Sequence, residues 1–287
     1  MSNRYDIAIV GSGAAGLSAA VNAKIRNKNI LVFGNRDLSH KLNKAPLIKN
    51  YLGFYNIKGR DLKNEFQGHI DAMNINIIYE RVNAVYAMGD YFTISVNQKN
   101  YESKAVIIAA GIEQTSPLKG EQELLGKGVG YCATCDAPLY KGKVVTIIGY
   151  NREAEQEANF VSELASKLYY IPRYKADYSL KDNIEVVLDM PLEIVGKDKV
   201  EKLVLKNKEI ITDGIFVLKD SISPGQLVPG IELDKGHIKV DINMKTSIRG
   251  CYAAGDCAGK PYQYMKAAGQ GQVAALNAVS YLDSIIN

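Results

Sequence analysis

Short apolar runs alternate with glycine-rich turns over the first third of the chain. Residues 5–10 (YDIAIV), 30–33 (ILVF) and 105–110 (AVIIAA) are the clearest runs, and their length predicts buried strands. Between the first two runs, residues 17–25 carry apolar side chains at helical spacing. A strand, a glycine turn, a helix and a second strand in this order predict a parallel α/β fold.

The same pattern starts again near residue 143. Residues 143–148 (KVVTII) predict a strand, and a helix is expected at about 152–167. Residues 38–60 are expected to be irregular, and a last helix should run from about 263 to 285. The other expected elements are a helix at 59–73 and strands at 75–79, 82–88, 91–96, 168–171, 184–188, 192–196, 200–206 and 250–254.

Polar connections divide the chain near 114–118 and again near 219–226. They predict a discontinuous first domain (1–115 with 222–287) and a central domain inserted into it (116–221). Because each contains a strand–glycine–helix unit, we expect two Rossmann-like three-layer α/β domains of the nucleotide-binding type, the second inserted in the first.

The composition narrows the possible functions. The chain has 287 residues, of which 47% are hydrophobic and 23% charged, so disorder and a coiled coil are excluded. A net charge of +4 is too small to indicate nucleic-acid binding, and no apolar run reaches the ~18 residues of a membrane span. Four cysteines without a signal peptide indicate a reducing compartment, so a cytoplasmic protein is expected.

The first glycine turn has the spacing of a dinucleotide-binding motif. Gly11 permits the tight turn, Gly13 lets the backbone approach a pyrophosphate, and Gly16 lets the following helix pack against the sheet. The phosphates would lie at the helix N-terminus, where free N–H groups favour anions. The predicted cofactor contacts from this turn are Gly11, Ser12, Gly13, Ala14, Ala15 and Gly16.

Two further positions fit a cofactor of this kind. The ribose partner expected about 20 residues on is usually an acid, but here the second strand ends in Gly34 and Asn35, and the Asn35 amide can bind a hydroxyl. Residues 253–256 (AAGD) end a second strand with Gly255 and Asp256. An N-terminal GxGxxG paired with a C-terminal AAGD resembles the flavin domain of FAD-dependent pyridine nucleotide-disulfide oxidoreductases.

A Cys-x-x-Cys pair is the chemical centre of the sequence. Cys132 and Cys135 are spaced for dithiol–disulfide exchange, in which one thiol attacks a partner disulfide and the other resolves the mixed intermediate. Asp136 follows directly, and its carboxylate can carry protons for this chemistry. Cys251 is expected to be a small buried residue, and Cys257 has no predicted catalytic role. No metal site is expected, because the cysteines lack zinc spacing and the three histidines are dispersed.

Residues 132–136 (CATCD), with the two cofactor motifs, resemble the low-molecular-weight thioredoxin reductases over the whole chain. The resemblance implies that Cys135 faces the flavin, that Cys132 attacks thioredoxin, and that Asp136 is the general acid and base. It also implies a homodimer. The further FAD contacts that it implies are Leu42, Asn50, Val82, Ala110, Gly111, Gly255, Asp256, Gln263 and Tyr264.

The second glycine turn departs from the NADPH-binding pattern. Gly149 and Ala154 are retained, but Asn151 replaces the middle glycine, and its side chain would block a pyrophosphate. Tyr150 adds bulk to the turn. Acidic residues in the following helix would repel phosphate; these are Glu153, Glu155 and Glu157.

The basic clamp for the 2′-phosphate is also depleted. Arg173 remains, but Tyr174 and Tyr178 occupy the two other positions where the family has Arg. NADPH is therefore not expected to bind. Intact FAD motifs, an intact Cys-x-x-Cys and a degenerate NADPH site resemble the ferredoxin-dependent flavin thioredoxin reductases, which implies ferredoxin as electron donor and thioredoxin as acceptor.

A basic segment supports an acidic donor. Residues 38–60 contain no acid, and Lys260 and Lys266 are expected near the same site, so such a patch could steer ferredoxin. Three alternatives stay open: an NADPH-dependent thioredoxin reductase that uses Arg173 and Lys175, an FAD-dependent dithiol oxidase, and a non-enzymatic FAD-binding protein. A solvated lysine-rich loop is the plain interpretation of the basic segment.

Overall fold

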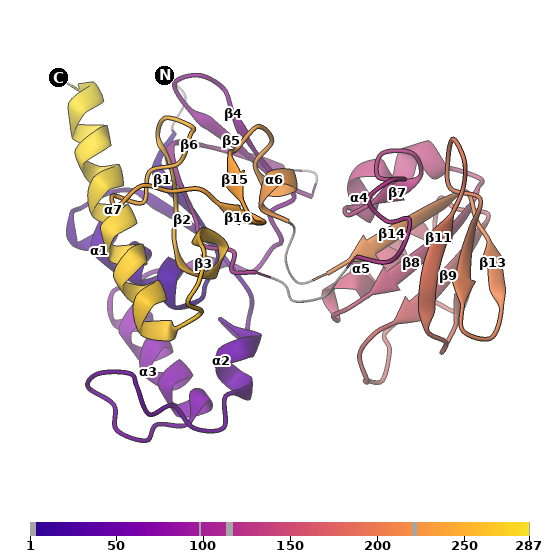
Figure 1. Cartoon of the computed structure of the whole chain (residues 1–287), viewed down its shortest axis with the longest axis horizontal. Coiled ribbons are helices and arrows are strands. Elements are labelled where there is room, and N and C mark those ends of the chain that lie inside the picture. Colours follow the sequence, from indigo (N-terminus) through magenta and orange to yellow (C-terminus); the bar gives the residue numbers. More distant parts are fainter. Residues whose placement is uncertain (1–3, 98, 113–116, 220–222, 287) are drawn as a thin grey trace. The chain divides into compact units, whose positions relative to one another are not determined.

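The chain folds into two units, and each contains one of the two strand–glycine–helix segments (Figure 1). Unit 1 is Met1–Ile112 with Ser223–Asn287, and unit 2 is Glu113–Ile222. The computed structural model describes residues 4–97, 99–112, 117–219 and 223–286, apart from the side chains of His40, Lys44, Cys135 and Ile286. The domain limits expected at 115/116 and 221/222 fall in or beside segments outside the described residues, so those limits stay a prediction.

Unit 1 is built on a seven-stranded sheet of order β3-β2-β1-β6-β5-β4, with β17 paired to β6. β1 lies at its centre and pairs in parallel with β2 and β6, whereas β6 pairs antiparallel with β5 through its first half and parallel with β17 through its second. The strands are β1 (Tyr5–Val10), β2 (Ile30–Phe33), β3 (Ile77–Ile78), β4 (Ala84–Ala87), β5 (Phe92–Val96), β6 (Lys99–Ile108) and β17 (Cys251–Ala253).

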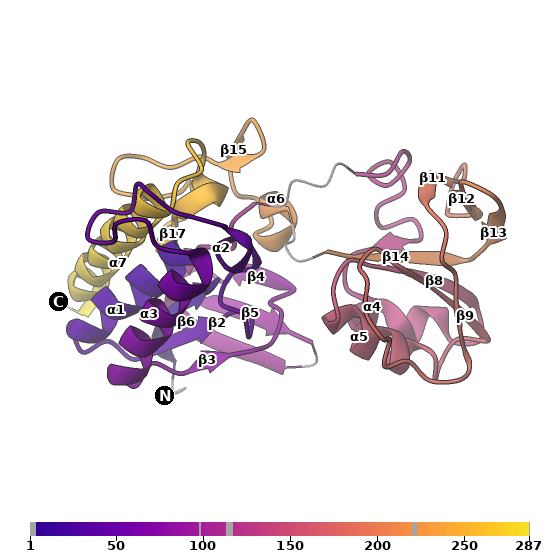
Figure 2. The same ribbon diagram turned by 90° about the horizontal axis from the view of Figure 1, so that it is seen from below.

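Helices α1, α3 and α7 pack on one face of this sheet (Figure 2). Alternate residues of β1, Ile7 and Ile9, are fully buried in the same cluster as the alanines of α1 and α7. Helices α1 and α7 pack so closely that a Cβ on Gly271 would stand 2.0 Å from Ala15 O. The helices of unit 1 are α1 (Ala14–Ile25), α2 (His40–Lys44), α3 (Gly59–Ala72), α6 (Pro224–Leu227), η2 (Gly255–Ala258) and α7 (Tyr264–Ile286). A small hairpin completes the unit, with strands β15 (Leu233–Asp234) and β16 (His237–Ile238).

Unit 2 has three layers. A parallel sheet of order β10-β9-β8-β14-β7 lies between helices on one face and the antiparallel sheet β11-β12-β13 on the other. Its strands are β7 (Val129–Gly130), β8 (Val144–Gly149), β9 (Lys167–Pro172), β10 (Ile184–Val186), β11 (Pro191–Val195), β12 (Lys202–Leu205), β13 (Glu209–Ile211) and β14 (Gly214–Leu218). Its helices are α4 (Ala133–Asp136), η1 (Ala137–Tyr140) and α5 (Glu153–Val161).

Several sequence predictions are corrected by the structure. The helix expected to 167 ends at Val161, because Ser166 N–H already donates to Lys143 O on the way into β9. The segment expected to be irregular contains the short helix α2, which the Ser39 hydroxyl caps by accepting from Leu42 N–H. Strand β14 was not predicted although all five of its residues are buried. Among the helices of the described residues, none has the length and apolar run that a bilayer crossing requires.

Candidate cofactor site and redox centre

The predicted cofactor residues of unit 1 gather where the parallel strands end. β1, β2, β6 and β17 all finish at the same edge of the sheet, and the glycine turn, Asn35, Gly111 and Asp256 follow them. Ligands of open parallel α/β sheets bind at this edge. The structure therefore brings together signals that lie more than two hundred residues apart in the sequence.

The three motif glycines occupy different surroundings. A Cβ on Gly11 would stand 2.2 Å from Ala109 O, and one on Gly16 would stand 1.8 Å from Gly11 O, so both are packed against backbone. A Cβ on Gly13 would meet nothing within 4 Å. The middle glycine alone of the three thus faces open space, which is the place where a pyrophosphate would approach.

The N-terminus of α1 is suited to an anion. Within the described residues, no side chain caps it, and its first turn contains no acid. Its first N–H groups are therefore available to phosphate oxygens, and the helix dipole favours negative charge there. The motif glycines and this helix end both fit the pyrophosphate of a dinucleotide.

Ser12 and Asn35 fix the turn to the end of β2. The buried Ser12 hydroxyl donates to Leu38 O over 2.8 Å and accepts from Asn35 N–H over 3.0 Å. The Ser12 side chain is thus engaged within the protein, and contact with a ligand would come from its backbone. The Asn35 side chain is exposed at the same edge, where it can reach a ribose hydroxyl.

Asp256 follows Gly255, whose backbone lies close to the start of α1, since a Cβ on Gly255 would stand 3.0 Å from Ala15 Cβ. Gly255 has φ +82°, and its N–H donates to Gln270 Oε1 over 3.0 Å. Asp256 Oδ2 lies 3.2 Å from Lys41 Nζ, which also donates to Ile112 O over 2.8 Å. This Lys41 contact joins three segments of unit 1 around one carboxylate.

The other predicted FAD contacts divide into three groups. Asn50 Nδ2 donates to Gln263 Oε1 over 2.7 Å, and the half-buried Tyr264, whose phenol pKa burial raises, packs beside them on a small apolar cluster. Leu42 and Val82 are buried, so their side chains belong to the core and a ligand could meet only their backbone. Ala110 and Gly111 directly follow β6, and Gly111 has φ +71° with open space beside it.

The Cys-x-x-Cys begins one residue after the end of β7 in unit 2, with Tyr131 between them. Cys132 is disulfide-bonded and partly buried, and its Sγ lies 3.5 Å from Thr134 Oγ1. The backbone of Cys135 lies in α4, but its side chain is outside the described part of the chain. Asp136 ends the same helix, and burial raises the pKa of its carboxyl above the ordinary value. It therefore keeps its proton to a higher pH than an exposed aspartate does.

In the glycine turn of unit 2, which follows β8, side chains of the protein occupy the space where a phosphate would bind. Asn151 Oδ1 accepts a hydrogen bond from Ala154 N–H over 3.0 Å, so it caps the helix where a phosphate would lie. A Cβ on Gly149 would stand 2.2 Å from the Tyr170 hydroxyl. The turn thus has no open face comparable to that at Gly13.

Tyr174, at one of the two positions where the family has Arg, binds α5, and the Tyr178 hydroxyl donates to Tyr174 O over 3.3 Å. The Tyr174 hydroxyl donates to the buried Glu155 carboxylate, which accepts from Ser179 N–H over 2.8 Å as well. Tyr170 and Tyr174 hydroxyls lie 3.0 Å apart, and burial raises the pKa of both. Arg173, the retained cation, is exposed.

Comparison with known proteins identifies the family. A family model described as pyridine nucleotide-disulphide oxidoreductase matches residues 5–271. The thioredoxin reductase of Treponema pallidum (strain Nichols) is 33% identical over 100% of both chains. The chain belongs to the thioredoxin reductases. It is therefore an oxidoreductase that acts on disulfides, as the resemblance at residues 132–136 implied.

Solved structures of this family confirm the predicted fold class. A ferredoxin-flavin thioredoxin reductase from Clostridium acetobutylicum is 63% identical with a TM-score of 0.96, covering 98% of this chain and 99% of that chain. Another structure from that organism is 64% identical with a TM-score of 0.91, covering 99% and 100%. The atypical thioredoxin reductase of Desulfovibrio vulgaris Hildenborough is 26% identical, with a TM-score of 0.73 and 98% of each chain covered.

Thioredoxin reductases are FAD flavoproteins, and the residues of unit 1 fit that group. Three features of unit 1 are compatible with a dinucleotide: the open face at Gly13, the uncapped N-terminus of α1, and the Asp256 carboxylate, which is paired with Lys41. Gln270 and Lys41, which hold this region together, were not predicted as site residues. Lys41 meets Asp256 across 215 residues and Gln270 meets Gly255 across 15, so the periodicity within one helix or strand could not have indicated either contact.

Lys266 does not contribute to the basic surface as expected. Its partly buried ammonium donates to Gly259 O and to Gly255 O, the latter over 3.0 Å. Desolvation lowers its pKa. It therefore lies beside Asp256, near the predicted cofactor site, but holds the loop there instead of standing at the surface, whereas Lys260 is exposed.

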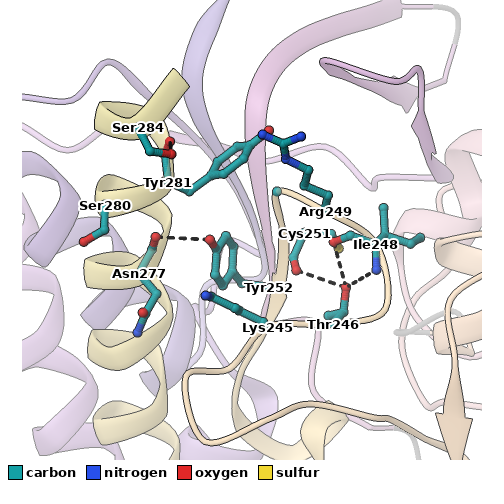
Figure 3. Close-up of a pocket in the computed structure, with 11 residues that line it drawn as sticks. Lys245, Thr246, Ile248, Arg249, Cys251, Tyr252, Asn277, Ser280, Tyr281 and Ser284 are labelled. Atoms are coloured by element: carbon teal, nitrogen blue, oxygen red, sulfur yellow. Dashed lines mark hydrogen bonds between the residues drawn. The ribbon is translucent and has the colours of Figure 1, made fainter. Parts of the chain in front are cut away.

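A separate pocket of about 410 Å³ lies between residues 245–252 and the C-terminal half of α7 (Figure 3). Thr246 Oγ1 donates to Cys251 O, and the Tyr252 hydroxyl donates to Asn277 O, so much of its polar lining is satisfied within the protein. None of the predicted catalytic or cofactor residues lines it. Cys251, which borders the pocket, is a free buried cysteine, in agreement with its predicted role.

Proposed function

We propose that this chain is a ferredoxin-dependent thioredoxin reductase. Electrons would pass from reduced ferredoxin to FAD, then to a Cys132–Cys135 disulfide, and then to thioredoxin. The observation that carries the proposal is the Asn151 cap on α5, because the pyrophosphate position of an NADPH site is taken by a side chain of the protein. The similarity to ferredoxin-flavin thioredoxin reductases over 98% of the chain supports it.

The residues of unit 1 would hold FAD by its pyrophosphate at Gly11–Gly16 and by its ribityl or ribose hydroxyls at Asp256. FAD, when bound, supplies the exchange between a one-electron donor and a two-electron disulfide couple. The resemblance assigns Cys135 to the flavin side and Cys132 to the thioredoxin side. We also expect a cytoplasmic homodimer, the first from cysteine usage and the second from family analogy.

The steps at the cysteines are a balanced thiol–disulfide exchange. The Cys132 thiolate attacks one sulfur of the thioredoxin disulfide, forming a mixed disulfide and releasing one thioredoxin thiolate. Cys135 then attacks Cys132, which restores the Cys132–Cys135 disulfide and releases the second thiolate. Two electrons and two protons reach thioredoxin in total, and Asp136 delivers protons to the departing thiolates.

An exposed surface of unit 1 has the chemistry that an acidic donor would require. In the loop between α2 and α3, Leu52 and Tyr55 are 84% and 90% exposed, and three exposed cations lie in the same loop or in the first turn of α3: Lys49, Lys58 and Arg60. Exposed apolar side chains on a segment that also carries exposed cations suit a transient interface with an acidic protein such as ferredoxin.

The test follows flavin bleaching under anaerobic conditions. NADPH, NADH and reduced ferredoxin are added separately to the oxidised yellow protein, with oxidised thioredoxin as final acceptor. We expect ferredoxin alone to bleach the flavin and to drive thioredoxin reduction, and we expect Cys132→Ser to bleach without reducing thioredoxin. Fast bleaching by NADPH would contradict the proposal, and rapid oxygen uptake with a small dithiol would indicate a dithiol oxidase.

A further inference from the structure

The carboxylate of Glu157, on α5, binds the backbone of the redox-active turn. Glu157 Oε2 accepts hydrogen bonds from Ala133 N–H over 2.8 Å and from Thr134 N–H over 3.3 Å. These are the two residues that follow Cys132. Glu157 itself is partly buried, and α4 packs against α5 at this point.

Those N–H groups are the ones that would otherwise stabilise a Cys132 thiolate. A cysteine that precedes a helical turn has its thiolate stabilised by the first free N–H groups of that turn. Here the groups already donate to a carboxylate, and the negative charge of that carboxylate lies close to the cysteine. Both effects disfavour a second negative charge on sulfur.

The other ionisable groups around the turn are placed differently. On α5, Glu155 is bound to Tyr174 and Ser179, and Glu153 is exposed. Tyr131, which precedes Cys132, donates to Glu121, and that carboxylate is paired with Lys219. Two further ionisable groups follow Cys132 in the chain, Asp136 on α4 and Tyr140 on η1. Among the described residues, Glu157 is the acid hydrogen-bonded to the N–H groups that follow Cys132.

We propose that Glu157 is a positioning residue that keeps the dithiol strongly reducing. An environment that stabilises thiolate makes a Cys-x-x-Cys oxidising, because it favours the reduced form, and removal of that stabilisation has the opposite effect. The couple is disulfide plus two electrons and two protons to dithiol, and Glu157 exchanges neither electrons nor protons. The inference rests on the proposed function only in taking Cys132 as the attacking thiol.

The test compares Glu157→Gln with Glu153→Gln, each in a Cys135→Ser background that leaves Cys132 as the reactive thiol. Both changes remove one negative charge from α5, but only the first touches the turn. The rate of iodoacetamide alkylation at Cys132 is measured by intact mass from pH 5 to 10. For Glu157→Gln we expect a profile shifted to lower pH, with about tenfold faster alkylation at pH 7. Glu153→Gln should follow the parent.

A second readout uses the variants with both cysteines present. Equilibration with dithiothreitol at pH 9 should move Glu157→Gln toward dithiol by up to about tenfold, which corresponds to about 30 mV. Coincident profiles for Glu157→Gln and the parent, in proteins with equal flavin content and melting temperature, would overturn the proposal. So would a rate change by the same factor at every pH, which indicates mere loosening of the turn. Neither readout needs ferredoxin, NADPH or thioredoxin, so the result is independent of the electron donor.

Discussion

Lys219 Nζ donates a hydrogen bond to Glu121 Oε1 over 3.0 Å, and both side chains are buried in unit 2. The same carboxylate accepts from Leu118 N–H over 2.8 Å and from the Tyr131 hydroxyl over 3.0 Å. Leu118 and Lys219 stand close to the two ends of unit 2, and Tyr131 precedes Cys132. One buried carboxylate thus joins both ends of the unit to the start of the redox-active turn.

Replacing Lys219 by Met should destabilise unit 2, because it leaves the Glu121 carboxylate buried without its cation. Breaking a buried pair in this way costs about 3–5 kcal/mol, and the remaining donors to Glu121 favour the lower end. Urea unfolding measures the loss. The matched control is Lys119→Met, which breaks an exposed pair with Glu193 at 2.9 Å and should cost less than about 1 kcal/mol. Equal unfolding midpoints for the two variants would contradict the argument.

Gly13→Ala should weaken FAD binding, whereas Gly16→Ala should destabilise the fold. Gly13→Ala meets no neighbour within 4 Å and has φ −77°, so the fold should change by at most about 1 kcal/mol, while FAD binding weakens at least about tenfold. Gly16→Ala drives a Cβ to 1.8 Å from Gly11 O and should destabilise unit 1 itself. Flavin released per protein and the melting temperature of the flavin-free form separate the two effects. A Gly13→Ala protein with the parent's FAD affinity would show that the cofactor lies elsewhere.

Asp136→Asn should slow thioredoxin reduction and yet stabilise the fold near neutral pH. Burial raises the pKa of this carboxyl above 3.8, so its contribution to stability is present at low pH and is lost as the pH rises through the folded-state pKa. Asparagine removes the cost of the buried charge. Loss of the proton carrier should reduce turnover by about 10²–10⁴-fold.

Melting temperature against pH, together with the turnover rate, checks the Asp136 prediction. The stability gained by Asp136→Asn should shrink as the pH falls toward 3.8, because both side chains are then neutral. Turnover equal to that of the parent would remove Asp136 from the chemistry. A stability gain that is the same at all pH values would show that the charge of the carboxylate is not its origin.

Cys251 and Cys257 should not react with an alkylating reagent in the native protein. Burial raises the pKa of Cys251 to about 12 and that of Cys257 to about 11, so neither is a thiolate at pH 8. Iodoacetamide should give no adduct on the native oxidised protein and two adducts after unfolding without reductant. Because both thiols titrate higher when folded, they also contribute a loss of stability above pH 9. A native adduct at Cys257 would contradict the burial of its sulfur.

Local patterns predicted those parts of the structure whose causes are local. β1 and β2 have the limits expected from their apolar runs, and the glycine turn lies between β1 and α1 as its motif predicted. β14 was equally visible as an apolar run and was not predicted. The end of α5 was mispredicted because a tertiary hydrogen bond, from Ser166 to Lys143, overrides a sequence that is compatible with helix.

The contacts that shape the sites could not be predicted in this way. Glu157 meets Ala133 across 24 residues, and Lys41 meets Asp256 across 215. In the sequence, Glu157 was identified only as a charge that repels phosphate, and Lys41 only as one of a basic run. Their roles depend on which distant segments the fold brings into contact, and such tertiary contacts cannot be predicted from a single sequence.

The pairing of β17 with the last residues of β6 makes the order of synthesis matter. Val106, Ile107 and Ile108 emerge from the ribosome long before Cys251–Ala253, with which they pair. At 5–20 residues per second, unit 1 waits roughly 7–30 s with this apolar strand edge open, while the whole of unit 2 is made and can fold. An open edge of this kind pairs readily with another chain. A chain that stops after unit 2 should therefore aggregate through β6, although every residue of its redox-active turn has been made.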